Sequence, residues 1–511
     1  MFDIIGCALM VPISNEENQE YSRITKISES SRKISWQDLK NRFKQKEWGE
    51  IGFDATIILL LIGFGLFIRI LLSYEARIDP NWGIGSGDII WNYNLSFKPF
   101  DIPIIGFADF NFYYNTWITA WYDNSWYLYE WLEPYNTYDF YSYPPVFMYF
   151  LVLTWRPGMS NLWMAFPMIL ADAACAGVVY LILKEVIKTK TSRIVAVVGG
   201  ILMAIAPLNV IYDGIYWLNP GPVTLLTIIA FYFAIKKKWW QAFFWLAIAT
   251  MTKQNALFFT YPMFMVMLGQ KVREKRIIEA ILESIMVALL FIGVALLLSI
   301  PYIVIDPYQY GRHMLFPGRK IQLIFETIPQ ASNDCVSFAI SLQELGFGGF
   351  LLKIASFGNY SMLWMILSAT IIATGMFWRS YNNKLDNIEF FEWIAIYTIF
   401  THIFMPRGVY KFYTAYYVPM ILIAFLGSIT YFLNNKKQVG ISTFIAGALF
   451  LWFNIWLMLM DRMAMPFYLF MVALFIALLG FLRFELKYMK EKKLRKEQLE
   501  LLGKNGQKIT N

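Results

Sequence analysis

The chain has 511 residues, of which 58% are hydrophobic and only 16% are charged, and its formal net charge is +8. About a quarter of the residues in soluble domains are charged, so this composition excludes an ordinary water-soluble protein. The three cysteines and two histidines are far apart, which excludes the ligand spacing of a structural zinc or haem site, and we do not interpret the net charge as nucleic-acid binding.

The apolar residues are gathered in long blocks. A block of ~20 apolar residues, folded as a helix, crosses the ~30 Å hydrocarbon core of a bilayer. Helices also satisfy all their backbone hydrogen bonds internally, as lipid requires. The sequence therefore predicts an all-α integral membrane protein with about twelve (11–13) transmembrane helices, in chain order 53–73, 161–183, 194–212, 215–235, 239–252, 256–270, 280–304, 361–378, 388–404, 412–433, 439–459 and 465–482.

Positive charge near span ends marks the cytoplasmic side of a membrane protein. Residues 23–46 contain eight Lys or Arg, and the tail 483–511 contains nine. Both termini are therefore expected in the cytoplasm. We predict a basic N-terminal segment at 1–52, a membrane domain at 53–482 and a basic tail after it. The membrane would be the cell membrane in a prokaryote and that of the endoplasmic reticulum in a eukaryote.

The same alternation places two long loops on the outer side, 74–160 and 305–360, and we expect both to carry juxtamembrane helices. The apolar stretch 143–155 is too short to cross the bilayer, so we interpret it as a helix of half depth. The spans 239–252 and 256–270 are also short, and they meet at Lys253. A polar junction below the outer surface predicts a cavity that opens outward.

The first outer loop is acidic and aromatic. Residues 74–160 carry nine carboxylates and three basic residues among many Trp and Tyr. Aromatic faces stack on sugar rings, and carboxylates bind hydroxyls and accept their protons. This loop therefore favours a carbohydrate site. The alternative is an interfacial aromatic belt with solvated acids.

Five ordered elements carry a resemblance to a known family. The first outer loop holds Ala-Asp-x-x-x-Tyr-Tyr (108–114) and then Tyr-Pro-Pro before a short apolar helix, and three later elements are 206–213 (APLNVIYD), 249–256 (ATMTKQNA) and 406–413 (PRGVYKFY). Together they resemble the GT-C superfamily of membrane glycosyltransferases, which use polyprenyl-phosphate sugars as donors. The resemblance departs from the mannosyltransferases of glycolipid anchors, because Asp109 is followed by Asn111 and no Asp-x-Asp is formed. No cofactor is therefore expected, and a divalent metal is not favoured.

The resemblance implies an inverting transfer of a hexose, such as mannose, from a polyprenyl- or dolichyl-phosphate sugar. The acceptor would be a lipid-linked glycan, a glycolipid or a protein on the outer or lumenal face. Asp109 is the candidate general base, because the leaving phosphate needs no strong acid and one carboxylate suffices. Asp213 would assist the base or orient the acceptor, and a helix-capping role before Gly214 is the alternative.

Basic residues on the outer side are candidates for the donor phosphate. Arg407 and Lys411 stand four residues apart and would share one face of a helical turn. Snorkelling to lipid headgroups is their alternative role. Lys253 would meet the same phosphate or a loop acid. The remaining candidate substrate-binding residues are in the first outer loop: Tyr113, Tyr143 and Asp88.

Asp172, near the middle of the second predicted span, and Arg69, near the end of the first, are charges within the membrane. We expect structural roles for both: Asp172 with a polar partner, and Arg69 snorkelling to the outer interface. Because charge within the spans is otherwise scarce, an enzyme is favoured over a transporter of a lipid-linked or small anionic substrate. A lipid-binding scaffold without catalysis is the third interpretation, and it would tolerate alanine at Asp109.

Overall fold

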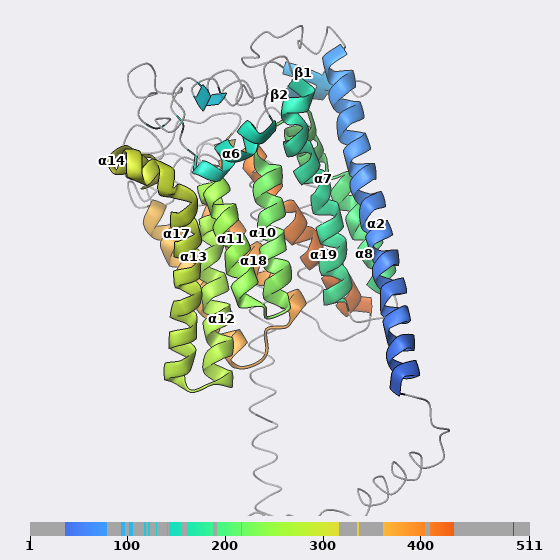
Figure 1. Cartoon of the computed structure of the whole chain (residues 1–511), viewed down its shortest axis with the longest axis vertical. Helices are drawn as coiled ribbons and strands as arrows, with labels where there is room; N and C mark the ends of the chain where they lie inside the picture. The colour runs from blue at the N-terminus through green and yellow to red at the C-terminus, as the bar shows by residue number, and fades with distance from the viewer. Residues whose placement is uncertain are drawn as a thin grey trace, which may run out of the picture. The chain divides into compact units, whose positions relative to one another are not determined.

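The described part of the chain is a set of helices in a computed structural model. The described residues are 36–78, 94–97, 102–105, 117–118, 121–122, 129, 141, 143–154, 161–187, 192–215, 217–315, 335–336, 361–403, 409–433 and 494. The longer helices after the first are α6 (Pro145–Thr154), α7 (Asn161–Val186), α8 (Ser192–Ala204), α10 (Pro220–Ile235), α11 (Trp239–Thr252), α12 (Thr260–Glu274), α13 (Ile277–Ile305), α14 (Pro307–Leu315), α17 (Ser361–Tyr381), α18 (Asn387–Ile403) and α19 (Val418–Leu433). Figure 1 shows α10, α11 and α13 side by side, in agreement with their contacts.

The chain divides into two units, Met1–Ile57 and Ile58–Asn511. Helix α2 (Trp36–Ile78) begins in the first unit and continues into the second. The span predicted at 53–73 is therefore the middle of a longer helix. The Lys, Arg, Gln and Glu residues before it are good helix formers and extend the helix toward the N-terminus.

Four described helical stretches are long and apolar enough to cross a membrane: Gly49–Ser73, Ala165–Val186, Ser192–Ile215 and Ile277–Ile305. Shorter apolar helices occupy Pro145–Thr154, Pro220–Ile235 and Val418–Thr430. This agrees with the prediction of a helical membrane protein. The spans predicted at 439–459 and 465–482 lie outside the described residues.

The third predicted span is interrupted near its end. Helix α8 stops at Ala204, a single turn α9 (Pro207–Asn209) follows, and a π-helix η4 (Val210–Ile215) continues it. Proline has no N–H for the preceding helical turn, which explains a break at Pro207. The wider π-turn changes the direction of the side chains after it, and such turns are frequent at functional sites. Asp213 lies in this π-helix.

Helices α11 and α12 are short and meet near Lys253, as predicted. The backbone of Lys253 is extended, with φ −156° and ψ 136°, and the 3₁₀-helix η5 (Gln254–Phe259) leads into α12. The predicted short helix after the Tyr-Pro-Pro motif is α6, whose ten residues are about 15 Å long. That length is half of a bilayer core.

The described part of the chain is almost entirely helical, as predicted, and the exceptions are two short pairs of strands. Strands β1 (Asn94–Phe97) and β2 (Ile102–Ile105) pair antiparallel in the first outer loop. Strand β3 (Cys335–Val336) pairs with β4 (Val409–Tyr410), which brings the second outer loop beside the segment between α18 and α19. The first pair is a local hairpin, whereas β3 bonds to a partner that is distant in sequence, so no local pattern identifies that second pair.

Small residues allow α2 to approach α7 and α8 within the second unit. A Cβ added at Gly177 of α7 would lie 2.8 Å from Ile58, and one at Gly200 of α8 would lie 2.5 Å from Leu61. Close approach through small residues is the usual packing of membrane helices, because lipid supplies no hydrophobic force between them. It positions the segment of α2 that carries Arg69 against α7.

Aromatic residues of the first outer loop form a buried cluster. Trp117 packs edge-on against Tyr141 with ring centroids 5.1 Å apart, and Tyr129 packs against Tyr302 at 5.0 Å. Burial raises the pKa of Tyr129 well above its ordinary value, so its neutral hydroxyl donates to the carbonyl of Tyr143 at 2.8 Å. These aromatic side chains hold the loop on the helices and are not exposed for stacking on a sugar.

Candidate functional site

Lys253 lies at the centre of a polar cluster between helix ends. Its side chain is only 2% exposed. Its ammonium group donates to Oδ1 of Asn219 at 2.7 Å. The same group lies over the rings of Tyr413 at 4.3 Å, Tyr143 at 4.8 Å and Tyr416 at 5.7 Å. We call these five residues the lysine cage.

Further hydrogen bonds fix the lysine cage. Asn219 donates through Nδ2 to the hydroxyl of Tyr143 at 3.0 Å and accepts from the hydroxyl of Tyr416 at 3.2 Å. A desolvated ammonium group over tyrosine faces is stabilised by the ring quadrupoles, and by more than at an exposed site. The cage is therefore a preorganised site of positive charge, built on the start of α10, the end of α11, the Tyr-Pro-Pro segment and the 3₁₀-helix η8 (Lys411–Tyr416).

Asp213 is fully buried near the cage, in the π-helix η4. Its Oδ1 accepts the backbone N–H of Gly221 at 2.7 Å, in the first turn of α10. Asp213 therefore caps the N-terminus of α10, which follows it in the chain. The sequence-based alternative was also a helix cap, but a local one beside Gly214. Among the described residues its Oδ2 has no hydrogen-bond partner, an unusual state for a buried oxygen.

A second charged group lies next to Asp213. Oδ2 of Asp172 accepts a hydrogen bond from Nε of Arg69 at 2.6 Å and forms an ion pair with its Nη2 at 2.5 Å, and both side chains are fully buried. Oδ1 of Asp172 accepts from Nδ2 of Asn209 at 2.9 Å. Asp172 thus has the polar partner that its sequence context predicted. The snorkelling role predicted for Arg69 is wrong, because its guanidinium group bonds inside the helix bundle.

Two glycines make room for this ion pair. A Cβ at Gly214 would lie 2.8 Å from Cγ of Arg69, and one at Gly221 would lie 2.8 Å from Cβ of Asp172. Gly214 follows Asp213 directly, and Gly221 donates to it. The ion pair and the buried carboxylate are therefore parts of one polar core at the end of α8 and the start of α10.

The structure tests the position of only some predicted site residues. Tyr143, Asp213 and Lys253 come together in or beside the lysine cage. For Lys411 only the backbone is described, at the first residue of η8. The other predicted site residues lie outside the described residues: Asp88, Asp109, Tyr113 and Arg407.

The expected helical turn that joins Arg407 to Lys411 is wrong. Val409 and Tyr410 form strand β4, and the 3₁₀-helix begins only at Lys411. Val409 and Tyr410 are extended, so a shared helical face is no longer an argument for placing Arg407 beside Lys411. The pairing of β4 with the second outer loop is what makes this backbone extended.

Sequence reasoning missed three members of the lysine cage: Asn219, Tyr413 and Tyr416. One signal was present, because Asn219 precedes the Pro-Gly-Pro start of an apolar helix, where a polar residue often marks a helix end. The opposite charges in two different spans, Arg69 and Asp172, could also have predicted an ion pair. Within the described part of the chain, no three His, Cys, Asp or Glu side chains gather as a metal-binding group.

Comparison with known proteins gives no match: no protein-family model fits the sequence, and no curated protein is significantly similar to it. The class of the protein therefore follows from its own features. It is a helical protein with four described helices able to span a membrane, a buried ion pair and a lysine cage at the helix ends.

Proposed function

We propose that the chain is a GT-C-like membrane glycosyltransferase with about twelve spans and both termini in the cytoplasm. It transfers a hexose from a polyprenyl- or dolichyl-phosphate sugar to a lipid-linked, glycolipid or protein acceptor. The transfer occurs on the outer face of a cell membrane or the lumenal face of the endoplasmic reticulum. No metal is assigned to the reaction.

One observation supports this proposal most. Residues from four of the sequence elements that carry the family resemblance meet in one place: Tyr143 from Tyr-Pro-Pro, Asp213 from 206–213, Lys253 from 249–256 and Tyr413 from 406–413. They are up to 270 residues apart in sequence. Convergence of these elements on one cluster is what a shared site would produce.

In the proposed mechanism Asp109 takes the proton of the acceptor hydroxyl as that oxygen attacks the anomeric carbon of the donor sugar. The bond from this carbon to the phosphate oxygen breaks, and the configuration inverts. Lys253, Arg407 and Lys411 stabilise the charge that grows on the leaving phosphate. Tyr113, Tyr143 and Asp88 hold the sugar or acceptor, and Asp213 fixes the start of α10 beneath the site.

Two structural findings favour the alternative function, a membrane transporter. Arg69, Asp172 and Asp213 are all buried within the helices, so charge there is less scarce than the sequence suggested. The broken stretch Ser192–Ile215 also resembles the discontinuous helices of transporters. Against this, the ion pair joins helices α2 and α7 with both partners fully enclosed and offers no charge to a substrate.

One experiment separates the two functions. We expect purified protein to consume a polyprenyl-phosphate hexose in the presence of membrane lipid extract, with a product one hexose heavier by mass spectrometry. Cells that lack the protein should accumulate the unextended acceptor. Saturable uptake into proteoliposomes, without donor turnover and without a change in cellular lipid-linked glycans, would instead support the transporter.

Lys253→Met is expected to weaken donor binding by about 10- to 100-fold, the worth of a charge-assisted hydrogen bond. Methionine has similar volume and needs no hydrogen bond, so the free energy of unfolding should change by less than about 1.5 kcal/mol. Because Lys253 is 2% exposed, donor binding requires a tyrosine of the cage to move aside. The measurements are donor affinity and thermal unfolding in detergent.

Lys238→Met is the matched control for this test, because Lys238 is exposed at the opposite end of α10. It should change neither quantity. A Lys253→Met protein with normal donor affinity and reduced stability would make the lysine cage a purely structural feature.

A further inference from the structure

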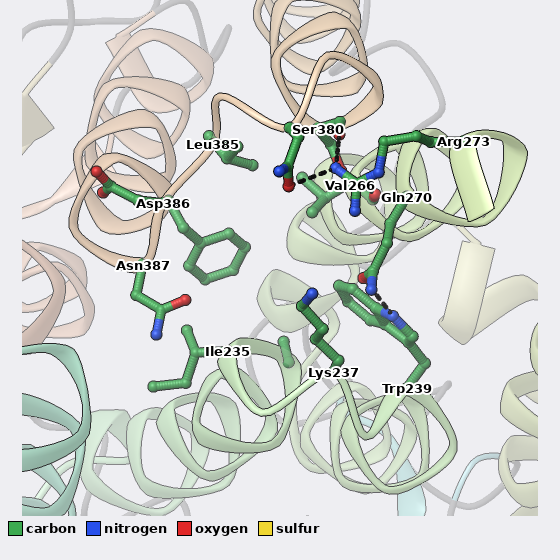
Figure 2. A pocket seen from close by; sticks show the side chains of 13 residues that line it. Ile235, Lys237, Trp239, Val266, Gln270, Arg273, Ser380, Leu385, Asp386 and Asn387 are labelled. Atoms are coloured by element: carbon green, nitrogen blue, oxygen red, sulfur yellow. Dashed lines mark hydrogen bonds between the residues drawn. The ribbon is translucent and has the colours of Figure 1, made fainter. Parts of the chain in front are cut away.

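A second hollow lies at the other end of α10 (Figure 2). Helix α10 has 16 residues, so its two ends are separated by about 24 Å. The pocket has a cavity volume of about 70 Å³ and is open to the surroundings. Residues at the ends of α10, α12 and α17 and at the starts of α11 and α18 line it. It is therefore separate from the lysine cage.

Two turns at this pocket have an unusual backbone. Lys237 and Asn383 both have positive φ, 59° and 55°, and both line the pocket. Each follows a helix that closes with a Schellman pair of hydrogen bonds: Lys237 N to Ala234 O with Lys238 N to Phe233 O, and Asn383 N to Ser380 O with Lys384 N to Arg379 O. Glycine is preferred at this position and asparagine is tolerated. Lys237 is therefore an unusual residue for a left-handed backbone conformation. A strained residue of this type suggests that its side chain has a function at this position.

The basic residues around the pocket differ in how they are paired. Arg273 is held in place, because Nη1 donates to Ser380 O and to Oδ1 of Asn383, and Nη2 donates to Glu274. Other ion pairs at this end are Lys236–Glu185, Lys271–Glu283, Lys275–Glu283 and Arg379–Glu389. The ammonium group of Lys237 has no hydrogen bond or ion pair with any described residue, and Figure 2 shows it pointing into the pocket.

The rest of the lining suits a polar ligand. The amide of Asn387 lines the pocket, and it too has no hydrogen bond within the described residues. The one acidic residue in the lining, Asp386, is occupied, because its Oδ1 accepts the N–H groups of Ile388 and Glu389. An approaching anion would therefore meet the Lys237 ammonium group and the fixed Arg273 guanidinium group. Glu274, which pairs with Arg273 and lies near Lys237, offsets part of this positive charge, and the Asp386 carboxylate is partly neutralised by the start of α18.

We propose that this pocket binds the phosphate group of an anionic membrane lipid, with Lys237 as its main contact. Pockets between membrane helices that carry basic residues at the headgroup level bind such lipids. The charge pattern of the sequence assigns this end of the bundle to the cytoplasmic side, where anionic lipids are concentrated. The bound lipid would join α10, α12 and α17 at their ends and does not take part in glycosyl transfer.

Native mass spectrometry of the purified full chain, titrated with phosphatidylserine, tests this proposal. Lys237→Gly and Lys237→Gln should each weaken phosphatidylserine binding by about fivefold, as expected for one lysine near the headgroups. Glycine accepts the left-handed backbone without strain, so Lys237→Gly should unfold at the same or a higher temperature than wild type. Lys237→Gln keeps a long side chain and removes only the charge, and it decides the result if the glycine variant folds poorly.

Lys238→Ala is the matched control, because Lys238 is the next residue, is exposed and does not line the pocket. It should leave lipid binding within the error of wild type. Equal weakening by Lys238→Ala and Lys237→Gln would overturn the proposal, because Lys237 would then only add to a diffuse basic surface. Displacement of the lipid by inorganic phosphate at similar concentration would show that the ligand is a soluble phosphate and would overturn the lipid assignment.

Discussion

Arg69→Met is expected to lower the free energy of unfolding by about 3–5 kcal/mol. The substitution keeps an apolar stem of similar length but leaves the carboxylate of Asp172 fully buried without its cation. Two backbone carbonyls, of Gly65 and Ala204, also lose the donor that they share. Denaturant titration of the purified protein in detergent measures the loss.

A double substitution tests whether the loss of stability comes from the unpaired buried charge that a single substitution leaves behind. Arg69→Met combined with Asp172→Leu removes both charges, so we expect it to be more stable than either single variant. Arg276→Met is the matched control, because Arg276 is exposed and has no ion pair within the described residues. It should stay within about 0.5 kcal/mol of wild type. A loss of less than about 1 kcal/mol for Arg69→Met would mean that water or lipid reaches Asp172.

Asp109→Asn is expected to lower turnover by about 10²- to 10⁴-fold, the usual contribution of a general base. Asparagine keeps the size and the hydrogen bonding of aspartate but does not accept a proton. Donor affinity should change little, because the proposal assigns the donor phosphate to Lys253, Arg407 and Lys411. Arg407→Ala should instead weaken both donor binding and turnover. Initial rates and donor titration with the purified variants give both quantities.

Asp101→Asn is the control for Asp109→Asn, because it removes one carboxylate from the same acidic loop and should leave turnover near wild type. A loss common to both variants would assign the effect to the charge of the loop. If Asp109→Asn keeps turnover within about threefold of wild type, Asp109 is not the base. The search would then move to Asp213 and Asp88, although full burial of Asp213 requires the site to open first.

Within the described residues, the sequence by itself determined most of the apolar helical segments, although it did not fix all of their ends. Lipid offers no partner to backbone groups, so every long apolar block must be a helix, and its length sets the span. The helices at 161–186 and 277–305 lie close to the predicted spans. The junction at Lys253 was predictable for the same reason, because a polar run between two short apolar blocks interrupts the helix locally.

Only the tertiary structure decided which side chains meet. The partner of Arg69, the membership of Asn219 and Tyr416 in the lysine cage, and the pairing of β3 with β4 depend on how helices rotate and pack against one another. These contacts join residues far apart in the chain, and no local period encodes them. A helix forms from local sequence because its backbone hydrogen bonds lie within one segment. The lysine cage and the ion pair lie between segments, so their composition depends on how the whole chain packs.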